Sequence, residues 1–389
     1  MSQVSARVVV SRFFLLISLL ILFAVPFHYW TVDRKGVLRA LSPIPAVLAS
    51  WTVKCSEGSP MWQKEMMSFG IWTLRAPASQ SAFIDVDGQV HHCESGWQGD
   101  VLFSSLVSEN SLFQYGSLTK PITSALIIKL VNDGKLEYDL GITELIGIGE
   151  PYDEAEGFDS VTLGDLMTHN SGVSGEIFSE DKIPWCPYRM DQIVNQKVWV
   201  TPSGSHKYSN LNYCLLGAAI SKATGRSYRA AVNGAFNLET YGINFVNGAH
   251  PEGWVRPDYR YHDFYRDDIR PSFDYYAISS TAGMGGSAKG YARLIRDLLN
   301  SSSGQHLTGK DSSCDSRKIR NCYGHLFYLY EPPNGDLVNV KGGHMPGYSS
   351  VVVVDHRREV FVWLGNTDTP NASSGLNITR FIDALSSLW

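Results

Sequence analysis

The chain has 389 residues, of which 44% are hydrophobic and 18% are charged. This composition is typical of a folded protein with a large buried core and excludes a disordered chain. The formal net charge is -5 and no long run of one sign occurs, so the sequence lacks the basic surface that nucleic-acid binding requires, and we expect no nucleic-acid partner.

The N-terminal segment is far more apolar than the rest of the chain. Residues 13–31 contain no Asp, Glu, Lys or Arg, and basic residues flank them on both sides. A run of this length matches the ~20 residues that span a bilayer. It ends in Phe27, Tyr29 and Trp30, which suit a membrane interface better than a signal cleavage site. We therefore interpret residues 1–12 as a short tail and residues 13–31 as an uncleaved transmembrane anchor, with a cleaved signal peptide as the alternative.

The part of the chain that follows the anchor is expected outside the cytoplasm, on the periplasmic side if the source is a Gram-negative bacterium. The six cysteines show no metal-site spacing, and their even number favours disulfides in an exported chain. Cys314 and Cys322 enclose a short polar stretch that closure would order, so this is the first pair that we predict. Further pairings, which no such argument supports, are Cys55 with Cys93 and Cys186 with Cys214. Buried thiols are the alternative.

Residues 32–60 predict a tether, because "SPIPAVLAS" contains two prolines and no sustained amphipathic period. The main domain is expected over residues 61–389. It opens with a hairpin, since two strand-like runs in "AFIDVDGQVHHCESGW" flank Asp87 and Gly88. A helix follows from Thr119, with apolar residues at a period of about 3.6 and Gly134 at its end.

The region from about residue 160 to 300 has a mainly helical pattern, and after Tyr323 the sequence predicts successive strands. The strands are expected in "YGHLFYLY", "DLVNVKG", "SSVVVVD" and "EVFVWLGN", and a last helix in "ITRFIDALSSLW". This order favours an α+β fold, in which helices flank one antiparallel sheet and a large helical lobe is inserted.

The stretch "YGSLTK" places Ser117 three residues before Lys120 at the start of a helix. Residues three apart share one helix face, so the Lys120 amine can reach the Ser117 hydroxyl. A serine hydroxyl becomes a nucleophile when a neighbouring base takes its proton, and lysine is such a base only when its pKa is lowered. The pair alone also fits a helix cap followed by a solvated lysine, so other motifs must decide.

Three stretches together resemble the serine beta-lactamase and penicillin-binding protein superfamily. "FQYGSLTKPITSALIIKLVNDGKLEYD" is similar to its nucleophile helix, "SGSHKYSNLNYCLLGAAISKATGRSY" to its second motif, and "VNVKGGHMPGYSSVVVVD" to the third motif, on an edge strand. The similarity runs from about Phe83 to the C-terminus and keeps the order of the motifs. It is greatest with the class C beta-lactamase-like group, which includes serine esterases and D-amino-acid peptidases.

The resemblance implies three catalytic residues. Ser117 would attack the substrate carbonyl and form an acyl-enzyme. Lys120 and Tyr208 would share the proton transfers, with Tyr208 passing the proton to the leaving group and later activating water. Which of the two is the general base stays open. His169, in "THNSG", resembles a structural position of the family at which histidine bonds nearby backbone.

The resemblance also implies a substrate-binding set. Asn210 would steady Lys120 and touch the substrate, and Lys341 would place positive charge beside Tyr208 and attract a carboxylate. Gly342 and Gly343 would let an extended ligand approach the strand backbone. The backbone N–H groups of Ser117 and His344 would hold the oxyanion. The family usually has threonine or serine where this chain has Gly342, which weakens the case for carboxylate recognition. The His344 ring either orients substrate or points to solvent.

Two classes of function are consistent with these residues. The first is a membrane-anchored serine hydrolase that acts on an ester, an amide, a beta-lactam or a cell-wall-derived D-alanyl peptide, with no metal or organic cofactor. The second is a non-catalytic module that keeps the fold and binds a ligand or takes part in assembly. The joint presence of Ser117, Lys120, Tyr208, Asn210 and Lys341 favours the hydrolase, because a module without turnover would be free to lose any of them.

Overall fold

The structure, a computed structural model, describes most of the chain. The described residues are 18, 23–147, 157–175, 186, 190, 198–201, 206–247, 253–258, 260, 275–301, 314–367 and 376–389.

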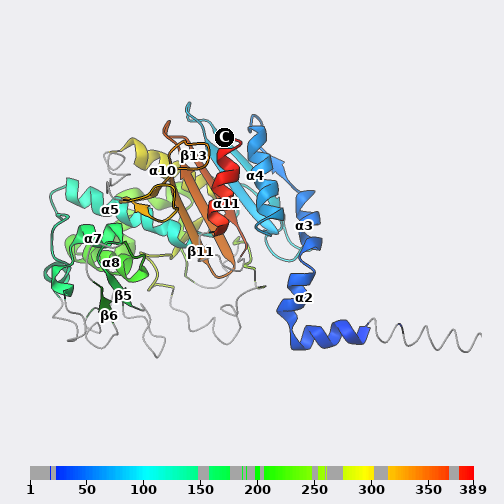
Figure 1. The fold of residues 1–389 in the computed structure, drawn as a ribbon, viewed down its shortest axis with the longest axis horizontal. Helices are drawn as coiled ribbons and strands as arrows, with labels where there is room; N and C mark the ends of the chain where they lie inside the picture. Colours follow the sequence, from blue (N-terminus) through cyan, green and yellow to red (C-terminus); the bar gives the residue numbers. More distant parts are fainter. Residues whose placement is uncertain are drawn as a thin grey trace, which may run out of the picture.

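The centre of the fold is an eight-stranded antiparallel sheet with the order β1-β3-β2-β13-β12-β11-β10-β9 (Figure 1). The strands are β1 Lys54–Cys55, β2 Ala78–Ile84, β3 Val90–Gly96, β9 Cys322–Tyr323, β10 Tyr328–Tyr330, β11 Val338–Met345, β12 Tyr348–Val354 and β13 Val360–Gly365. The predicted hairpin and the predicted C-terminal meander are both confirmed. β2 and β13 are buried along their whole length because helices cover both faces of the sheet.

One face of the sheet packs against α4 (Met61–Trp72) and α11 (Leu376–Ser386). Met66, Phe83, Trp363 and Phe381 belong to the apolar cluster on this face. The other face packs against α10 (Ala288–Asn300), and Figure 1 shows the helices of the inserted lobe on the side of the sheet away from α4. The two faces therefore have separate apolar cores.

The inserted lobe is mainly helical, as the sequence predicts. Its helices are α5 Thr119–Asn132, α6 Ile142–Ile146, α7 Leu163–Thr168, α8 Asn210–Thr224 and α9 Tyr228–Phe236. It also contains two small sheets that were not predicted, built from β4 Phe113–Gln114, β5 Val173–Gly175, β6 Val198–Val200, β7 Asn244–Phe245 and β8 Met284–Gly286. These strands are only two or three residues long, which is too short for an alternating pattern to be recognised. The α+β class is confirmed.

The described N-terminal residues cover part of the expected anchor and all of the expected tether. In the described portion of the chain, no helix combines the length and apolar character needed to cross a membrane. Of the expected anchor, residues 13–17 and 19–22 lie outside that portion, and residues 23–31 are helical.

The expected tether is partly folded: it contains α2 (Arg34–Ala40), α3 (Pro43–Ser50) and β1. Both prolines of "SPIPAVLAS" lie in the first turn of α3, where backbone N–H groups have no partner within the helix, so they do not break it. Ala46 and Ala49 pack against Ile71 of α4, and this contact holds α3 on the domain.

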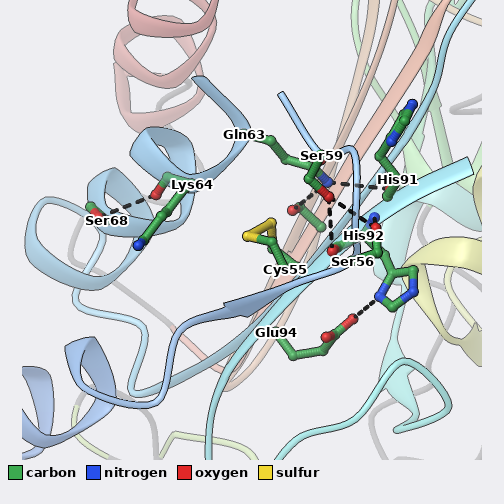
Figure 2. Close-up of a disulfide and its surroundings, with 11 residues drawn as sticks. Cys55, Ser56, Ser59, Gln63, Lys64, Ser68, His91, His92 and Glu94 are labelled. Carbon is green, nitrogen blue, oxygen red and sulfur yellow. Dashed lines mark hydrogen bonds and ion pairs between the residues drawn. A yellow bond between two sulfur atoms is a disulfide. The ribbon is translucent and has the colours of Figure 1, made fainter. Parts of the chain in front are cut away.

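All three predicted disulfides are present: Cys55–Cys93, Cys186–Cys214 and Cys314–Cys322. Figure 2 shows the first, which joins β1 to β3 beside α4. Around it, the Ser56 backbone N–H donates to the His92 carbonyl at 2.8 Å, and the His92 N–H donates to the Ser56 hydroxyl at 3.0 Å. β1 is only two residues long, so this disulfide and these hydrogen bonds fix its register.

We predict that removing the Cys55–Cys93 disulfide destabilises the domain more than removing Cys314–Cys322. The two bonds close intervals of 38 and 8 residues, for which the loop-entropy relation gives about 4 and about 2.5 kcal/mol. Urea unfolding of the two double alanine variants, each against the parent domain, measures this difference. A larger loss for the shorter interval would contradict the prediction.

Candidate active site

The Ser117 hydroxyl and the Lys120 amine are in contact. Ser117 lies in a short 3-10 helix, Gly116–Leu118, that runs directly into α5, so Ser117 and Lys120 lie on one face of a continuous helical segment. Lys120 Nζ is 3.1 Å from Ser117 Oγ. α5 is almost entirely buried, and its packing against α8 and α9 in the lobe holds both side chains in place.

The backbone before Ser117 approaches β11 very closely. Gly116 has φ +55°, and a Cβ there would lie 2.7 Å from the His344 backbone nitrogen. A Cβ on Gly343 would lie 2.1 Å from the Tyr115 carbonyl oxygen. Both distances are shorter than real Cβ contacts, so only glycine permits this approach. This approach brings the 3-10 helix that carries Ser117 against the His344 backbone. The backbone N–H groups of Ser117 and His344 are the expected oxyanion donors.

Tyr208 and Asn210 reach the pair from the N-terminal end of α8. The Tyr208 hydroxyl lies 2.7 Å from Ser117 Oγ, and Asn210 Oδ1 accepts a hydrogen bond from Lys120 Nζ at 2.9 Å. His169 Nδ1 accepts from the Ser209 backbone N–H at 3.3 Å. The structural interpretation of His169 is therefore confirmed, since it supports the segment that carries Tyr208.

The surroundings of Lys120 favour its neutral form. Its side chain is fully buried, and burial lowers its pKa from the ordinary value, although neighbouring Tyr208 opposes the shift. Besides Ser117 Oγ, the amine contacts Asn210 Oδ1 and, at 3.0 Å, the Thr281 carbonyl oxygen. These two oxygens can only accept, so a neutral amine can donate its two hydrogens to them and keep its lone pair for the Ser117 proton. The arrangement suits a general base.

Lys341 is the second buried cation of the site. It is 1% exposed and donates a hydrogen bond to the Tyr323 hydroxyl at 2.8 Å. Its Nζ lies 4.2 Å from the centre of the Tyr323 ring and 5.0 Å from that of Tyr208. Burial, and then the charges of Lys120 and Arg320, hold its pKa well below the ordinary value. Lys341 thus stands beside Tyr208 as expected, while its bonded acceptor is Tyr323.

Sequence reasoning missed two partners of these lysines, Tyr323 and Thr281. Tyr323 bonds Lys341 and, at 3.1 Å, the hydroxyl of Tyr213. Its one signal in the sequence is that it directly follows Cys322, whose disulfide with Cys314 restrains this turn. Thr281 contributes only its backbone carbonyl to Lys120. No residue type marks such a contact, so the sequence carries no signal for it.

The two glycines of the third motif differ from expectation. A Cβ on Gly342 would lie 2.3 Å from Ile378 Cδ1 of α11, just as one on Gly343 would meet Tyr115. Their missing side chains therefore admit α11 and the Ser117 segment against the strand, and both glycines also line a cavity.

The outer edge of β11 is open next to this site. β10 pairs only with residues Val338 to Val340, and no other described strand pairs with that edge from Lys341 to Met345. A cavity of about 310 Å³ adjoins it. All the predicted site residues except fully buried Lys120 line this cavity: Ser117, Tyr208, Asn210, Lys341, Gly342, Gly343 and His344. The edge-strand prediction is confirmed for this half of β11.

Comparisons with known proteins agree with the fold. The probable fimbrial assembly protein FimD, serogroup H1, of Dichelobacter nodosus is 27% identical over 95% of both chains. Esterase EstB of Burkholderia gladioli is 29% identical over 42% of this chain and 44% of its own. A class C beta lactamase from Rhodobacter sphaeroides superposes with a TM-score of 0.63 at 17% identity, covering 84% of this chain and 99% of its own. At that identity the superposition concerns the fold alone.

The family model described as Beta-lactamase matches residues 80–385. This range starts in β2, includes the Ser117 helix, the lobe and the third motif, and ends in α11. The match covers well over half of the chain, and the chain therefore belongs to the beta-lactamase family.

Proposed function

We propose that this protein is a serine hydrolase that forms an acyl-enzyme at Ser117 with an ester, an amide or a beta-lactam. The observation that carries the proposal is the position of Ser117 Oγ, 2.7 Å from the Tyr208 hydroxyl and 3.1 Å from the buried Lys120 amine. A hydroxyl between two groups that can take its proton is an activated nucleophile.

In acylation, Ser117 Oγ attacks the substrate carbonyl carbon and its proton passes to Lys120 or, through the short contact, to Tyr208. The backbone N–H groups of Ser117 and His344 hold the negative charge that develops on the carbonyl oxygen. The bond to the leaving group then breaks, and Tyr208 gives that group a proton while Lys120 resupplies Tyr208. In deacylation water takes the place of the leaving group, and its proton follows the reverse route to the Ser117 oxygen.

We also propose that the domain works outside the cytoplasm, held to a membrane by residues 13–31. The three disulfides support an oxidising compartment. In the described part of the apolar segment, Phe23, Phe27 and Trp30 are 70%, 70% and 40% exposed, and a bilayer would cover such side chains.

A second candidate function is a non-catalytic assembly module. It is favoured by the name of the relative FimD, a probable fimbrial assembly protein that matches nearly the whole chain. The two functions differ in whether Ser117 reacts.

The first test is the Ser117→Ala variant. We expect parent protein to gain one covalent adduct at Ser117 from a fluorophosphonate, a penicillin or a short activated ester, and the variant to gain none, because Ser117 carries the hydroxyl that both Lys120 and Tyr208 contact. Intact-mass analysis with peptide mapping measures the adduct. Turnover retained by a folded variant would reject the mechanism, and no adduct on well-folded parent protein would favour the assembly module.

A second test concerns Lys120 as the base. Because burial lowers its pKa, the neutral form is reached as pH rises through a value below 10.5, and we expect kcat/KM for a neutral ester to rise along that limb. Lys120→Arg, which stays charged, should lower kcat/KM by about 10²- to 10⁴-fold. Lys129→Arg is the matched control, since Lys129 lies on the same helix but is exposed and paired with Asp133. Equal effects of the two substitutions would contradict the assignment.

A third test concerns Tyr323 as a positioning residue. Tyr323→Phe keeps the ring but removes the hydroxyl that accepts from Lys341, so the buried ammonium becomes costlier and Lys341 should lose its proton at lower pH. We expect a loss of kcat of about tenfold or more with a shifted pH profile. Tyr330→Phe on neighbouring β10, whose hydroxyl bonds Asp383 instead, is the control. A Tyr323→Phe profile identical to the parent's would remove this role.

A further inference from the structure

The cavity at Ser117 continues into a strongly apolar region beyond the catalytic groups. Its far wall consists of Leu74, Val351, Trp363, Ile378 and Phe381. Trp363 and Phe381 are each 1% exposed and belong to the core between the sheet and α11. This wall therefore offers a ligand a preformed apolar surface.

Three of the hydroxyl groups that line the cavity have their hydrogens engaged elsewhere. Ser349 donates to the Thr367 carbonyl at 2.9 Å, Ser350 to the Tyr115 carbonyl at 2.7 Å, and Thr367 to the Leu74 carbonyl at 2.5 Å. An anion bound against this wall would lose its water without gaining these donors, which is costly. The five wall residues thus disfavour a charged group and favour an uncharged one, and the two cations that line the same cavity, Lys341 and Arg320, are not among them.

The position of Tyr208 tells which arm of the substrate meets this wall. The leaving group must lie within hydrogen-bond reach of the Tyr208 hydroxyl to receive its proton. Lys341 Nζ lies 5.0 Å from the centre of the Tyr208 ring. Gly342, the next residue on β11, faces Ile378. Lys341 thus marks the Tyr208 side of β11 and Gly342 the α11 side. One cavity is lined by Tyr208, Gly342 and Ile378, so an arm that starts at the Tyr208 hydroxyl can reach α11 past the unpaired edge of β11, and we assign the leaving group to this arm.

We propose that this apolar wall binds the leaving alcohol or amine, so that the preferred substrates are esters or amides whose leaving group carries an uncharged alkyl or aryl chain. The inference rests on the proposed function at Ser117. Ile378 is the specificity-determining residue, since it fills the space that a side chain at position 342 would occupy. A hydroxyl-bearing side chain at position 342 would displace Ile378.

The kinetic test varies one arm of the ester at a time. With acetate esters of methyl, butyl and hexyl alcohols, kcat/KM of the parent should rise by up to about fourfold for each methylene buried. Methyl esters of acids of the same lengths should show a much flatter series. Dependence on the acid arm with none on the alcohol arm would overturn the inference.

Two variants locate the effect on Ile378. Ile378→Phe should remove the gain for hexyl acetate while leaving methyl acetate within about threefold, and Ile378→Ala should shift the preference to bulkier alcohols. Ile382→Ala is the matched control: it lies one turn further along α11, is 1% exposed and does not line this cavity. It should destabilise the fold without changing the chain-length preference. A preference unchanged in both Ile378 variants, or changed equally in the control, speaks against the proposal.

A binding test separates the subsite from catalysis. In the Ser117→Ala protein, fluorine NMR should detect para-fluorobenzyl alcohol binding at least about tenfold more tightly than para-fluorobenzoate, and adding Ile378→Phe should weaken the alcohol. If these results hold but parent protein turns over no ester, the subsite stands and the proposed hydrolase function fails. If the alcohol binds no better than the benzoate, or ignores Ile378→Phe, the inference is wrong whatever the turnover.

Discussion

The buried amine of Lys120 is the constraint on which the site depends. Burying a charged ammonium costs free energy, and the partners that the described residues give this amine are hydroxyls, an amide oxygen, a backbone carbonyl and tyrosine rings, with no carboxylate among them. Removing the proton relieves that cost, so burial lowers the pKa of Lys120 and shifts the equilibrium toward the neutral, basic amine. Ser117, Asn210 and Thr281 come from three separate parts of the chain, and their convergence on one nitrogen ties α5, α8 and the turn before β8 together.

Lys341 is also buried, and burial lowers its pKa as it does that of Lys120. Its ammonium lies among tyrosine rings and bonds a single hydroxyl, so it too carries a lowered pKa. Two cations near one phenol would repel each other if both were charged in a buried site. Tyr208 is 39% exposed and lines the cavity, and its ring lies beside both lysine amines. The site thus combines two buried lysine amines, whose pKa values are lowered, with the partly exposed hydroxyl of Tyr208.

A contact could be predicted when its residues lie close together in the sequence or belong to a recognisable motif. Ser117 and Lys120 are three residues apart, so helix geometry alone pairs them, and the motif resemblance supplied Tyr208 and Asn210. The roles of Tyr323 and Ile378 could not be predicted. Tyr323 lies on β9, a two-residue strand beside β10, and contacts Lys341 of β11, while Ile378 of the C-terminal helix packs against Gly342. Proline content misled the interpretation of residues 32–60, since prolines in a first helical turn cost little. The disulfide pairings were predicted correctly, although spacing supported only one of them.

The open edge of β11 has a further consequence for the molecule as a whole. Backbone groups that can receive an extended ligand can equally receive a strand from a second copy of the chain, which is how edge strands start aggregation. Here the stretch from Lys341 to Met345, which no described strand pairs on this edge, is short, contains a glycine pair, and begins and ends with a buried residue. These features weaken strand pairing, so an edge that lines the candidate site is also protected against self-association.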